Sequence, residues 1–281
     1  MLIEDDCTIS PAEFRRVSDT VYRHCGINLH DGKMSLVRSR LAKRLRAGRF
    51  ASVTDYLDHV EADPGGAEFT ALIDAISTNL TSFFREDGHF AHVATKAVPD
   101  LIRRQRAAGG GCTVRAWSAG CSTGEEPYSL AMTLLDATEQ CEPRDIKILA
   151  TDICTRVLKV AAAGVYDETR ARAVPPDKRS RYLRVERAGG RTSYRVDPAV
   201  QAMIRFRHLN LMGRWPFTGP FDLIFCRNVM IYFDKPTQER LIGRFHDHLA
   251  PGGLLFTGHS ESLTGVSHRF RYVQPTIYAK A

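Results

Sequence analysis

The sequence predicts an α/β protein in which a small all-helical N-terminal domain precedes a Rossmann-like sheet with an inserted antiparallel β-subdomain. Three observations support this expectation. Residues 1 to about 90 contain several helical patterns and no convincing strand. From residue 113 onward, short apolar runs alternate with helical patterns, as in a parallel sheet covered by helices. Between Pro175 and Pro198 a hairpin pattern interrupts that alternation.

The bulk properties are those of a globular protein. The chain has 281 residues with 43% hydrophobic content, which suits one large or two modest domains. No apolar run approaches the roughly 18 residues of a membrane span, and the first residues lack the basic and apolar regions of a signal peptide. We therefore expect a cytoplasmic monomer with no membrane insertion.

The cysteines and histidines predict no metal site. Seven cysteines are odd in number, scattered, and without a Cys-x-x-Cys pair. This pattern favours reduced thiols packed as small hydrophobic residues. His246 and His248 are two residues apart, so on a helix they would point in different directions.

The N-terminal helices begin at recognisable signals. Ser10, Pro11 and Glu13 are typical of a helix start, with a cap, a proline in the first turn and an early acid. Apolar residues at helical spacing predict a second helix from Gly32 to Gly48. Further helical patterns run through residues 53–60 and 69–80.

The helix within residues 33–49 carries the net charge of the chain. This segment holds seven Lys or Arg and no acid, and the net charge is +7, so the remainder is neutral overall. Arg40, Lys43 and Arg46 fall away from the apolar stripe and would face solvent. Such a patch is either a solvated helix face or a docking surface for an acidic protein or nucleic acid. Only Phe50 borders it, which disfavours single-stranded nucleic acid because bases need aromatic side chains to stack on.

A linker at residues 78–86 leads through a further helix, residues 89–106, into the sheet domain. Its paired aromatics beside Asn, Thr and Arg suit a segment whose aromatic side chains are buried against the protein while its polar side chains face a cleft. The expected strands are Thr113–Ala119, Ile146–Thr151, Ile204–Leu209, Leu223–Cys226 and Leu254–Thr257, with a terminal antiparallel pair between residues 270 and 279. The expected helices between them are Pro127–Thr138, Arg156–Ala162 and Thr237–Leu249.

The glycine turn at Gly120–Gly124 is the centre of the expected site. A strand–glycine–helix step presents backbone N–H groups at the carboxyl edge of a parallel sheet, where nucleotide-like ligands bind. The spacing is Gly-x-x-x-Gly and differs from that of a dinucleotide site. Glu125 and Glu126 follow at once and would repel a phosphate. The turn therefore favours an adenosine-bearing ligand with hydroxyls or a positive charge.

Other polar residues arrive at the same edge. Asp152 follows the second strand, where an acid can accept hydrogen bonds from two ribose hydroxyls, although it can equally cap the next helix. The later strands bring Asn210, Leu211, Arg227, Asn228 and Tyr232. Segments 182–185 and 192–196 predict a hairpin within an inserted subdomain of about residues 176–200, whose exposed edge can accept a peptide strand.

Six segments together resemble the chemotaxis receptor glutamate methyltransferases, the CheR family. They occur in the family's order and span essentially the whole chain: Thr78–Glu86, Ala116–Ala131, Ala150–Ile153, His208–Leu211, Cys226–Phe233 and Gly252–Leu263. The resemblance implies a helical domain, residues 1–90 with the linker. It implies an S-adenosylmethionine-dependent methyltransferase domain in residues 91–281.

The resemblance also implies the reaction. A methyl group passes from S-adenosylmethionine to the γ-carboxylate of receptor glutamates, giving methyl esters and S-adenosylhomocysteine. A glutamate carboxylate is already ionised at neutral pH, so no strong general base is required. The enzyme mainly aligns the reactants and removes water from the carboxylate. The positive sulfonium agrees with an acid-rich turn.

Site residues follow from the resemblance, position by position. Arg85 and Tyr232 are the expected catalytic residues, Arg85 fixing the incoming carboxylate and Tyr232 shaping the transfer path. The expected cofactor-binding residues are Asn79, Thr81, Arg85, Glu125, Asp152, Asn210, Leu211, Arg227 and Asn228.

The implied partners are chemoreceptor cytoplasmic domains. Their acidic methylation helices would dock on the basic helix at residues 33–49, which favours the docking interpretation of that patch over a merely solvated helix face. A receptor C-terminal pentapeptide would bind the β-subdomain in some family members. Two alternatives stay open from the residues alone: a methyltransferase acting on RNA or a small molecule, and a non-catalytic receptor-binding module.

Overall fold

The computed structural model describes residues 8–281 and begins with a helical domain. Its first helix starts as predicted, because the Ser10 hydroxyl accepts the Glu13 N–H (3.2 Å) while the Glu13 carboxylate accepts the Ser10 N–H (2.9 Å). A 3-10 turn at Asp31–Lys33 precedes the second helix. The helices are α1 (Pro11–Cys25), α2 (Met34–Gly48), α3 (Val53–Ala62) and α4 (Ala67–Ile76).

The apolar stripe of α2 is buried against this domain's core. Val37 and Leu41 are 0% exposed, and Met34 and Leu45 pack partly buried beside them. The structure contradicts the expectation that Arg40 faces solvent. Its Nη1 donates to three carbonyl oxygens at the end of α4, those of Ala75, Ile76 and Ser77, at 2.8, 2.5 and 2.9 Å. Arg40 therefore caps α4, because the last carbonyls of a helix lack partners within it.

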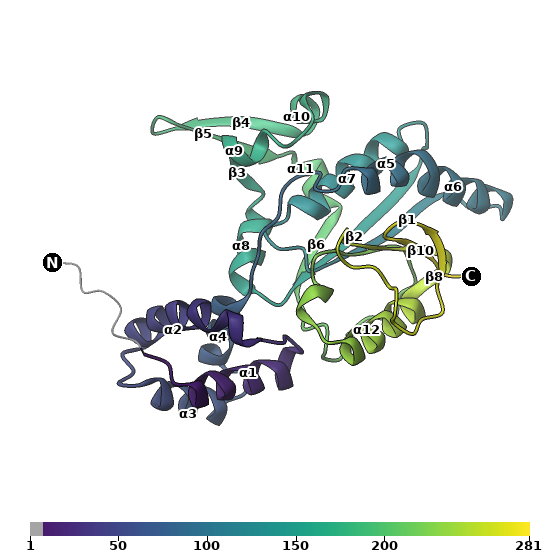
Figure 1. Ribbon diagram of the computed structural model, residues 1–281. Coiled ribbons are helices and arrows are strands. Elements are labelled where there is room, and N and C mark those ends of the chain that lie inside the picture. Colours follow the sequence, from purple (N-terminus) through teal and green to yellow (C-terminus); the bar gives the residue numbers. More distant parts are fainter. Residues whose placement is uncertain (1–7) are drawn as a thin grey trace.

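The second domain is built on a seven-stranded sheet of order β6-β2-β1-β7-β8-β10-β9 (Figure 1). Strands β6, β2, β1, β7 and β8 run parallel, and the terminal pair is antiparallel, as predicted. The strands are β1 (Cys112–Ala119), β2 (Arg144–Asp152), β6 (Ile204–His208), β7 (Phe221–Cys226), β8 (Leu249–Thr257), β9 (Arg271–Gln274) and β10 (Ile277–Ala279).

Helices cover both faces of this sheet, because alternate residues of its strands point to opposite sides. In β1, Val114 and Ala116 join one buried cluster, whereas Trp117 and Ala119 join the other. Figure 1 shows α5, α6 and α7 on one face and α12 on the opposite face. The helices of this domain are α5 (Gly88–His92), α6 (Val98–Ala107), α7 (Glu125–Ala137), α8 (Thr155–Ala163), α11 (Pro198–Ala202) and α12 (Lys235–His248).

A three-stranded antiparallel sheet of order β3-β5-β4 projects from the main domain (Figure 1). The predicted hairpin forms β4 (Leu183–Ala188) and β5 (Arg191–Val196), joined at Gly189 and Gly190 with φ of 56° and 73°, the conformation of a two-residue hairpin turn. The third strand, β3 (Val165–Asp167), lies before the expected bounds of about residues 176–200, because its three residues show no alternation that would place it. Helices α9 (Glu168–Ala171) and α10 (Pro176–Tyr182) accompany the sheet.

The helical domain is held against the carboxyl edge of the main sheet by polar contacts. The Asn28 N–H donates to the Tyr232 carbonyl (2.8 Å), and the Asn210 amide donates to the His24 carbonyl (2.6 Å). The Asp74 carboxylate accepts the N–H of Thr155 (2.7 Å), at the start of α8. These bonds make the helical domain one wall of the region where the parallel strands end.

Two sequence expectations can be compared directly with the described residues. The six cysteines among them are free and buried, and Cys7 lies outside them. No helix in residues 8–281 is long and apolar enough to cross a membrane. The domain division expected at residue 90 stays a prediction.

Candidate active site

The turn after β1 requires glycine at both ends. Gly120 and Gly124 have φ of 87° and 97°, where side chains are strained. A Cβ on Gly120 would lie 2.4 Å from Val229 Cγ2, and one on Gly124 would lie 2.9 Å from Tyr166 Oη. The turn therefore brings the β7–α12 loop and the β-subdomain close to the start of α7.

The N–H groups of this turn are used within the protein. Gly120 and Cys121 both donate to the Thr151 carbonyl, at 2.8 and 2.9 Å. Ser122 donates to Asp152 Oδ2 at 2.8 Å. These N–H groups are not free for a pyrophosphate, in agreement with the glycine spacing.

Asp152 is fixed at the end of β2 with its carboxylate 7% exposed. Besides Ser122, it accepts the Cys154 N–H at 2.9 Å. Burial raises the pKa of Asp152, and the two N–H bonds oppose that rise. The capping role left open for Asp152 belongs to Asp74, which accepts the N–H groups of Thr155 and Arg156 at 2.7 and 3.3 Å. The Asp152 carboxylate thus remains available to a ligand.

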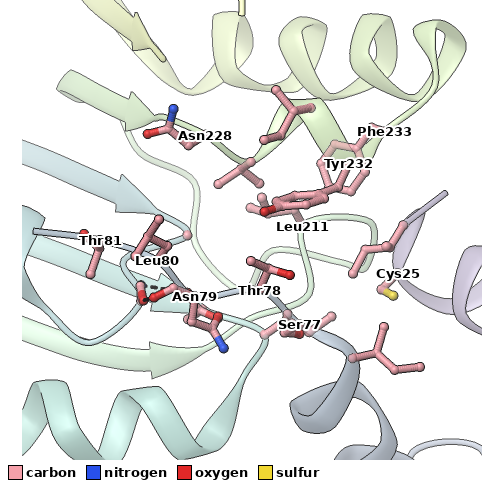
Figure 2. A pocket seen from close by; sticks show the side chains of 18 of the residues that line it. Cys25, Ser77, Thr78, Asn79, Leu80, Thr81, Leu211, Asn228, Tyr232 and Phe233 are labelled. Carbon is pink, nitrogen blue, oxygen red and sulfur yellow. Dashed lines mark hydrogen bonds between the residues drawn. The ribbon is translucent and has the colours of Figure 1, made fainter. Parts of the chain in front are cut away.

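A cavity of about 280 Å³ opens at this edge, between the helical domain, the linker and the sheet loops. Figure 2 shows Ser77, Thr78 and Asn79 of the linker across the cavity from Asn228 and Tyr232. Nine of the ten predicted site residues line it: Asn79, Thr81, Arg85, Asp152, Asn210, Leu211, Arg227, Asn228 and Tyr232.

Glu125 is the exception: it does not line this cavity, and its expected contact with the cofactor stays a prediction. Its carboxylate is 1% exposed and accepts hydrogen bonds from Thr123 Oγ1 (2.7 Å) and Arg170 Nη1 (3.1 Å). It therefore ties the turn to α9 of the β-subdomain. The cavity is lined by Glu126 instead, because consecutive residues of a helix point about 100° apart.

Arg227 is the buried cation of the site, with a side chain that is 1% exposed. It pairs with Glu86 Oε2 at 3.0 Å and Glu126 Oε2 at 3.2 Å, and it also donates to the Arg85 carbonyl. Burial opposes ionisation of Glu86, yet the Arg227 guanidinium holds the Glu86 pKa below its ordinary value. For Glu126 burial prevails over Arg227 and raises the pKa. The cluster joins the linker, α7 and the loop after β7.

Arg85 and Tyr232 line the cavity from two different segments, Arg85 from the linker and Tyr232 from the loop after β7. Arg85 Nη1 donates to the Leu80 carbonyl at 3.0 Å, and in residues 8–281 its guanidinium has no acidic partner. Tyr232 ends a 3-10 turn, Met230–Tyr232. Glu261, which is 5% exposed, holds this loop by accepting the N–H of Ile231 (3.1 Å) and that of Asn228 (2.6 Å).

Sequence reasoning missed the helical domain's share of the cavity. Residues Cys25, Ile27, Asn28, Leu29, His30, Lys33 and Leu36 line it. No spacing along the chain connects them with the sheet loops, so only the packing of the domains reveals them. Asn210 belongs to this junction, because its amide donates to His24 and its Oδ1 accepts the Met212 N–H at 2.9 Å.

Comparison with known proteins agrees with this architecture. The all-alpha domain of the CheR methyltransferases matches residues 12–77, and their S-adenosylmethionine-binding domain matches residues 79–279. The chain belongs to the CheR methyltransferase family. It is 44% identical over 271 residues to the chemotaxis protein methyltransferase of Klebsiella aerogenes, which covers 96% of this chain and 90% of that protein. It is 42% identical over 259 residues to a probable chemotaxis protein methyltransferase of Rhizobium etli, covering 92% and 96%.

The CheR resemblance is thereby confirmed, and with it an S-adenosylmethionine-dependent methyltransferase of chemotaxis. The cavity fits that cofactor. Asp152 has a fixed carboxylate that could accept hydrogen bonds from ribose hydroxyls, and Glu126 lies beside the glycine turn, where an acid would favour a sulfonium over a phosphate. Asn79, Thr81 and Asn228 add polar surface to the same walls.

Proposed function

We propose that this CheR family member methylates the γ-carboxylates of glutamates on the cytoplasmic helices of chemoreceptors. The observation that carries the proposal is Arg85, a cation on the cavity wall with no acidic partner in residues 8–281. An arginine fork matches a carboxylate in geometry and charge. The names of the relatives, chemotaxis protein methyltransferases, support the same substrate class. The site of action is then the cytoplasm.

The chemistry asks little of the protein beyond positioning. When bound, the cofactor supplies a methyl group on a positively charged sulfur. A glutamate carboxylate is already ionised at neutral pH, so the protein would only have to orient one of its oxygens toward that methyl group and would have no proton to remove. Arg85 orients the carboxylate, and Tyr232, together with the linker, narrows the cavity and removes water from the nucleophile.

A receptor docking surface extends from the cavity mouth along α2. Lys33 lines the cavity itself, and further cations on the exposed side of α2 lack an ion pair within the described residues. Arg40 and Arg44 do not contribute, because Arg40 caps α4 and Arg44 binds Glu68 at 2.7 Å. The exposed cations are Lys33, Arg38, Lys43, Arg46 and Arg49. Acidic methylation helices complement this surface in charge.

The β-subdomain offers a second contact for the receptor. In the order β3-β5-β4, strand β4 lies at an edge, and its Val185 is 53% exposed. An extended peptide can add to such an edge by main-chain hydrogen bonds, with alternate side chains giving specificity. We assign this edge to a receptor C-terminal pentapeptide.

The test is transfer of label from methyl-labelled S-adenosylmethionine to a receptor cytoplasmic fragment, followed by mild alkali. Release of labelled methanol identifies a carboxyl methyl ester. Label that survives alkali identifies another linkage and overturns the glutamate assignment. Arg85→Ala is expected to abolish transfer even at saturating S-adenosylmethionine, although it should also weaken S-adenosylhomocysteine binding because Arg85 is an expected cofactor contact. Arg103→Ala is the matched control, because Arg103 is 75% exposed and pairs only with Asp100 within the described chain; its transfer rate should equal that of the wild type.

A further inference from the structure

Three potential metal ligands converge outside the cavity wall. Glu86 ends the linker, His89 lies in α5, and His259 follows β8. Their ligand atoms all lie within 4.8 Å of one another. Spacing along the chain hides this group, because His259 is 173 residues from Glu86. None of the three lines the cofactor cavity.

His89 has a buried nitrogen that lacks a partner. The residue is 2% exposed, and its Nδ1 accepts or donates no hydrogen bond within the described chain. The other nitrogen, Nε2, lies 2.7 Å from Thr276 Oγ1. That hydroxyl also lies 2.6 Å from the Pro275 carbonyl, which can only accept, and when its proton is used there His89 Nε2 carries the ring proton and donates it to Thr276.

The tautomer leaves a lone pair on His89 Nδ1, facing another lone pair. Nδ1 lies 3.7 Å from Glu86 Oε2, a carboxylate oxygen. The ring is buried, which disfavours a charged imidazolium. Two acceptors facing each other in a buried place are unfavourable unless a cation or a proton lies between them.

The distances suit a small metal ion. Glu86 Oε2 lies 3.7 Å from His89 Nδ1 and 3.9 Å from His259 Nε2. Metal–ligand bonds of about 2.0–2.2 Å in a tetrahedron separate ligand atoms by about 3.4 Å, so the group closes by small movements. His259 makes the larger one freely, because its side chain is 66% exposed.

The charges beside this group are mixed, because the Glu86 oxygen that faces both histidines is already paired with the Arg227 guanidinium. Glu86 and Glu126 carry two negative charges when ionised, and Arg227 neutralises one of them. Hydrogen bonding of the outer ring nitrogen is usual for a metal-bound histidine, and Thr276 provides it for His89. Imidazole and carboxylate ligands together suit Zn²⁺.

We propose that Glu86, His89 and His259 bind a Zn²⁺ ion that joins the end of the linker to the loop after β8. The same linker carries Arg85, and Arg227 contacts both Glu86 and the Arg85 carbonyl. The ion thus stabilises the segment that forms one side of the cavity. It takes no part in methyl transfer and does not depend on the substrate assigned above.

The test is titration of the chelator-treated full-length protein with zinc sulfate, read by calorimetry, with bound zinc counted after dialysis. One ion per chain is expected, with a rise in the thermal unfolding midpoint. His259→Ala should weaken zinc binding at least tenfold, since loss of outer-shell groups alone costs 10–100-fold. It should also lose the midpoint rise while still binding S-adenosylhomocysteine, because His259 is exposed.

His268→Ala is the matched control, an exposed histidine of the same C-terminal segment outside the group. It should bind zinc as the wild type does. The proposal is overturned if the wild type binds no zinc, or if His259→Ala and His268→Ala take it up with the affinity of the wild type.

Discussion

Replacing Arg227 by methionine tests whether its charge holds the site together. Methionine keeps the length and apolar stem of the side chain and removes the guanidinium. Arg227 is 1% exposed and pairs with Glu86 and Glu126 at 3.0 and 3.2 Å, and those carboxylates are 10% and 12% exposed. The variant leaves both acids buried without a cation, and it also leaves the Arg85 carbonyl without its donor.

The expected loss is about 3–5 kcal/mol, the usual cost of removing one partner of a buried ion pair. At roughly 2–4 °C per kcal/mol for a domain of this size, the thermal unfolding midpoint should fall by about 6–20 °C. Differential scanning calorimetry of the full-length protein measures it. Adding Glu126→Gln removes one of the two stranded charges, so the double variant should recover part of the loss.

The loss of stability caused by Arg227→Met should also depend on pH. In the wild type, Arg227 holds the Glu86 pKa below its ordinary value, so the stability it contributes is present above the unfolded pKa and is lost as pH falls through the folded pKa. In the variant, burial is opposed only by the remaining contacts, those of His259 to Glu86 and Ser118 to Glu126, so the pKa of both carboxyls rises relative to the wild type. A carboxyl whose pKa is raised in the folded state makes the folded protein less stable as pH rises. The gap between the two proteins should therefore widen from about pH 4 to pH 7.

Arg103→Met provides the reference for an exposed ion pair, because the Arg103 side chain is 75% exposed. Its cost should stay below about 1 kcal/mol. The reasoning fails if Arg227→Met costs no more than Arg103→Met. It also fails if Glu126→Gln restores nothing in the double variant, since relief of stranded charge is the stated cause.

Two further predictions concern the cofactor and the receptor. Asp152→Asn should weaken S-adenosylhomocysteine binding, measured by calorimetry, about 10–150-fold, which corresponds to the loss of a charged hydrogen bond of about 1.5–3 kcal/mol. Glu126→Gln should weaken the same binding, whereas Glu125→Gln should change it little. Since burial raises the Asp152 pKa, wild-type affinity should begin to fall at a higher pH than an ordinary aspartate predicts; an unchanged affinity of Asp152→Asn would contradict the ribose assignment. Arg38→Glu should lower kcat/KM for a receptor fragment about tenfold with cofactor affinity unchanged. Arg40→Ala should instead lower the unfolding midpoint, because it removes the α4 cap. Equal kcat/KM values for Arg38→Glu and Arg40→Ala would contradict docking on α2.

The sequence predicts the architecture because local patterns and global fold agree. Apolar alternation marks the parallel strands, and the Ser10–Glu13 cap marks the first helix, since both signals depend on neighbouring residues. The position of the short strand β3 escapes prediction, because its partner β5 begins 24 residues after it ends and only pairing defines it. Arg40 escapes for a related reason: a long side chain can leave its helix face and bind another helix.

The site is predicted less completely, and the errors share one cause. Strand ends meet at one edge, so the sequence places Asp152, Asn228 and Tyr232 together correctly. It cannot decide which of Glu125 and Glu126 faces the cavity, because that depends on where α7 begins relative to the turn. A boundary shift of one residue exchanges the two side chains.

Glu86 shows why charge patterns alone do not assign roles in this protein. One carboxylate accepts the Arg227 guanidinium, the Asn228 amide (3.4 Å) and the His259 N–H (3.3 Å), so it joins segments from three parts of the chain. Its acidity is therefore set by tertiary contacts that no neighbouring residue in the sequence reveals. Where such an acid also faces the bare nitrogen of His89, the fold brings together a group of ligands that neither motif nor spacing contains. The functional residues hardest to predict in this chain are those that join its segments together.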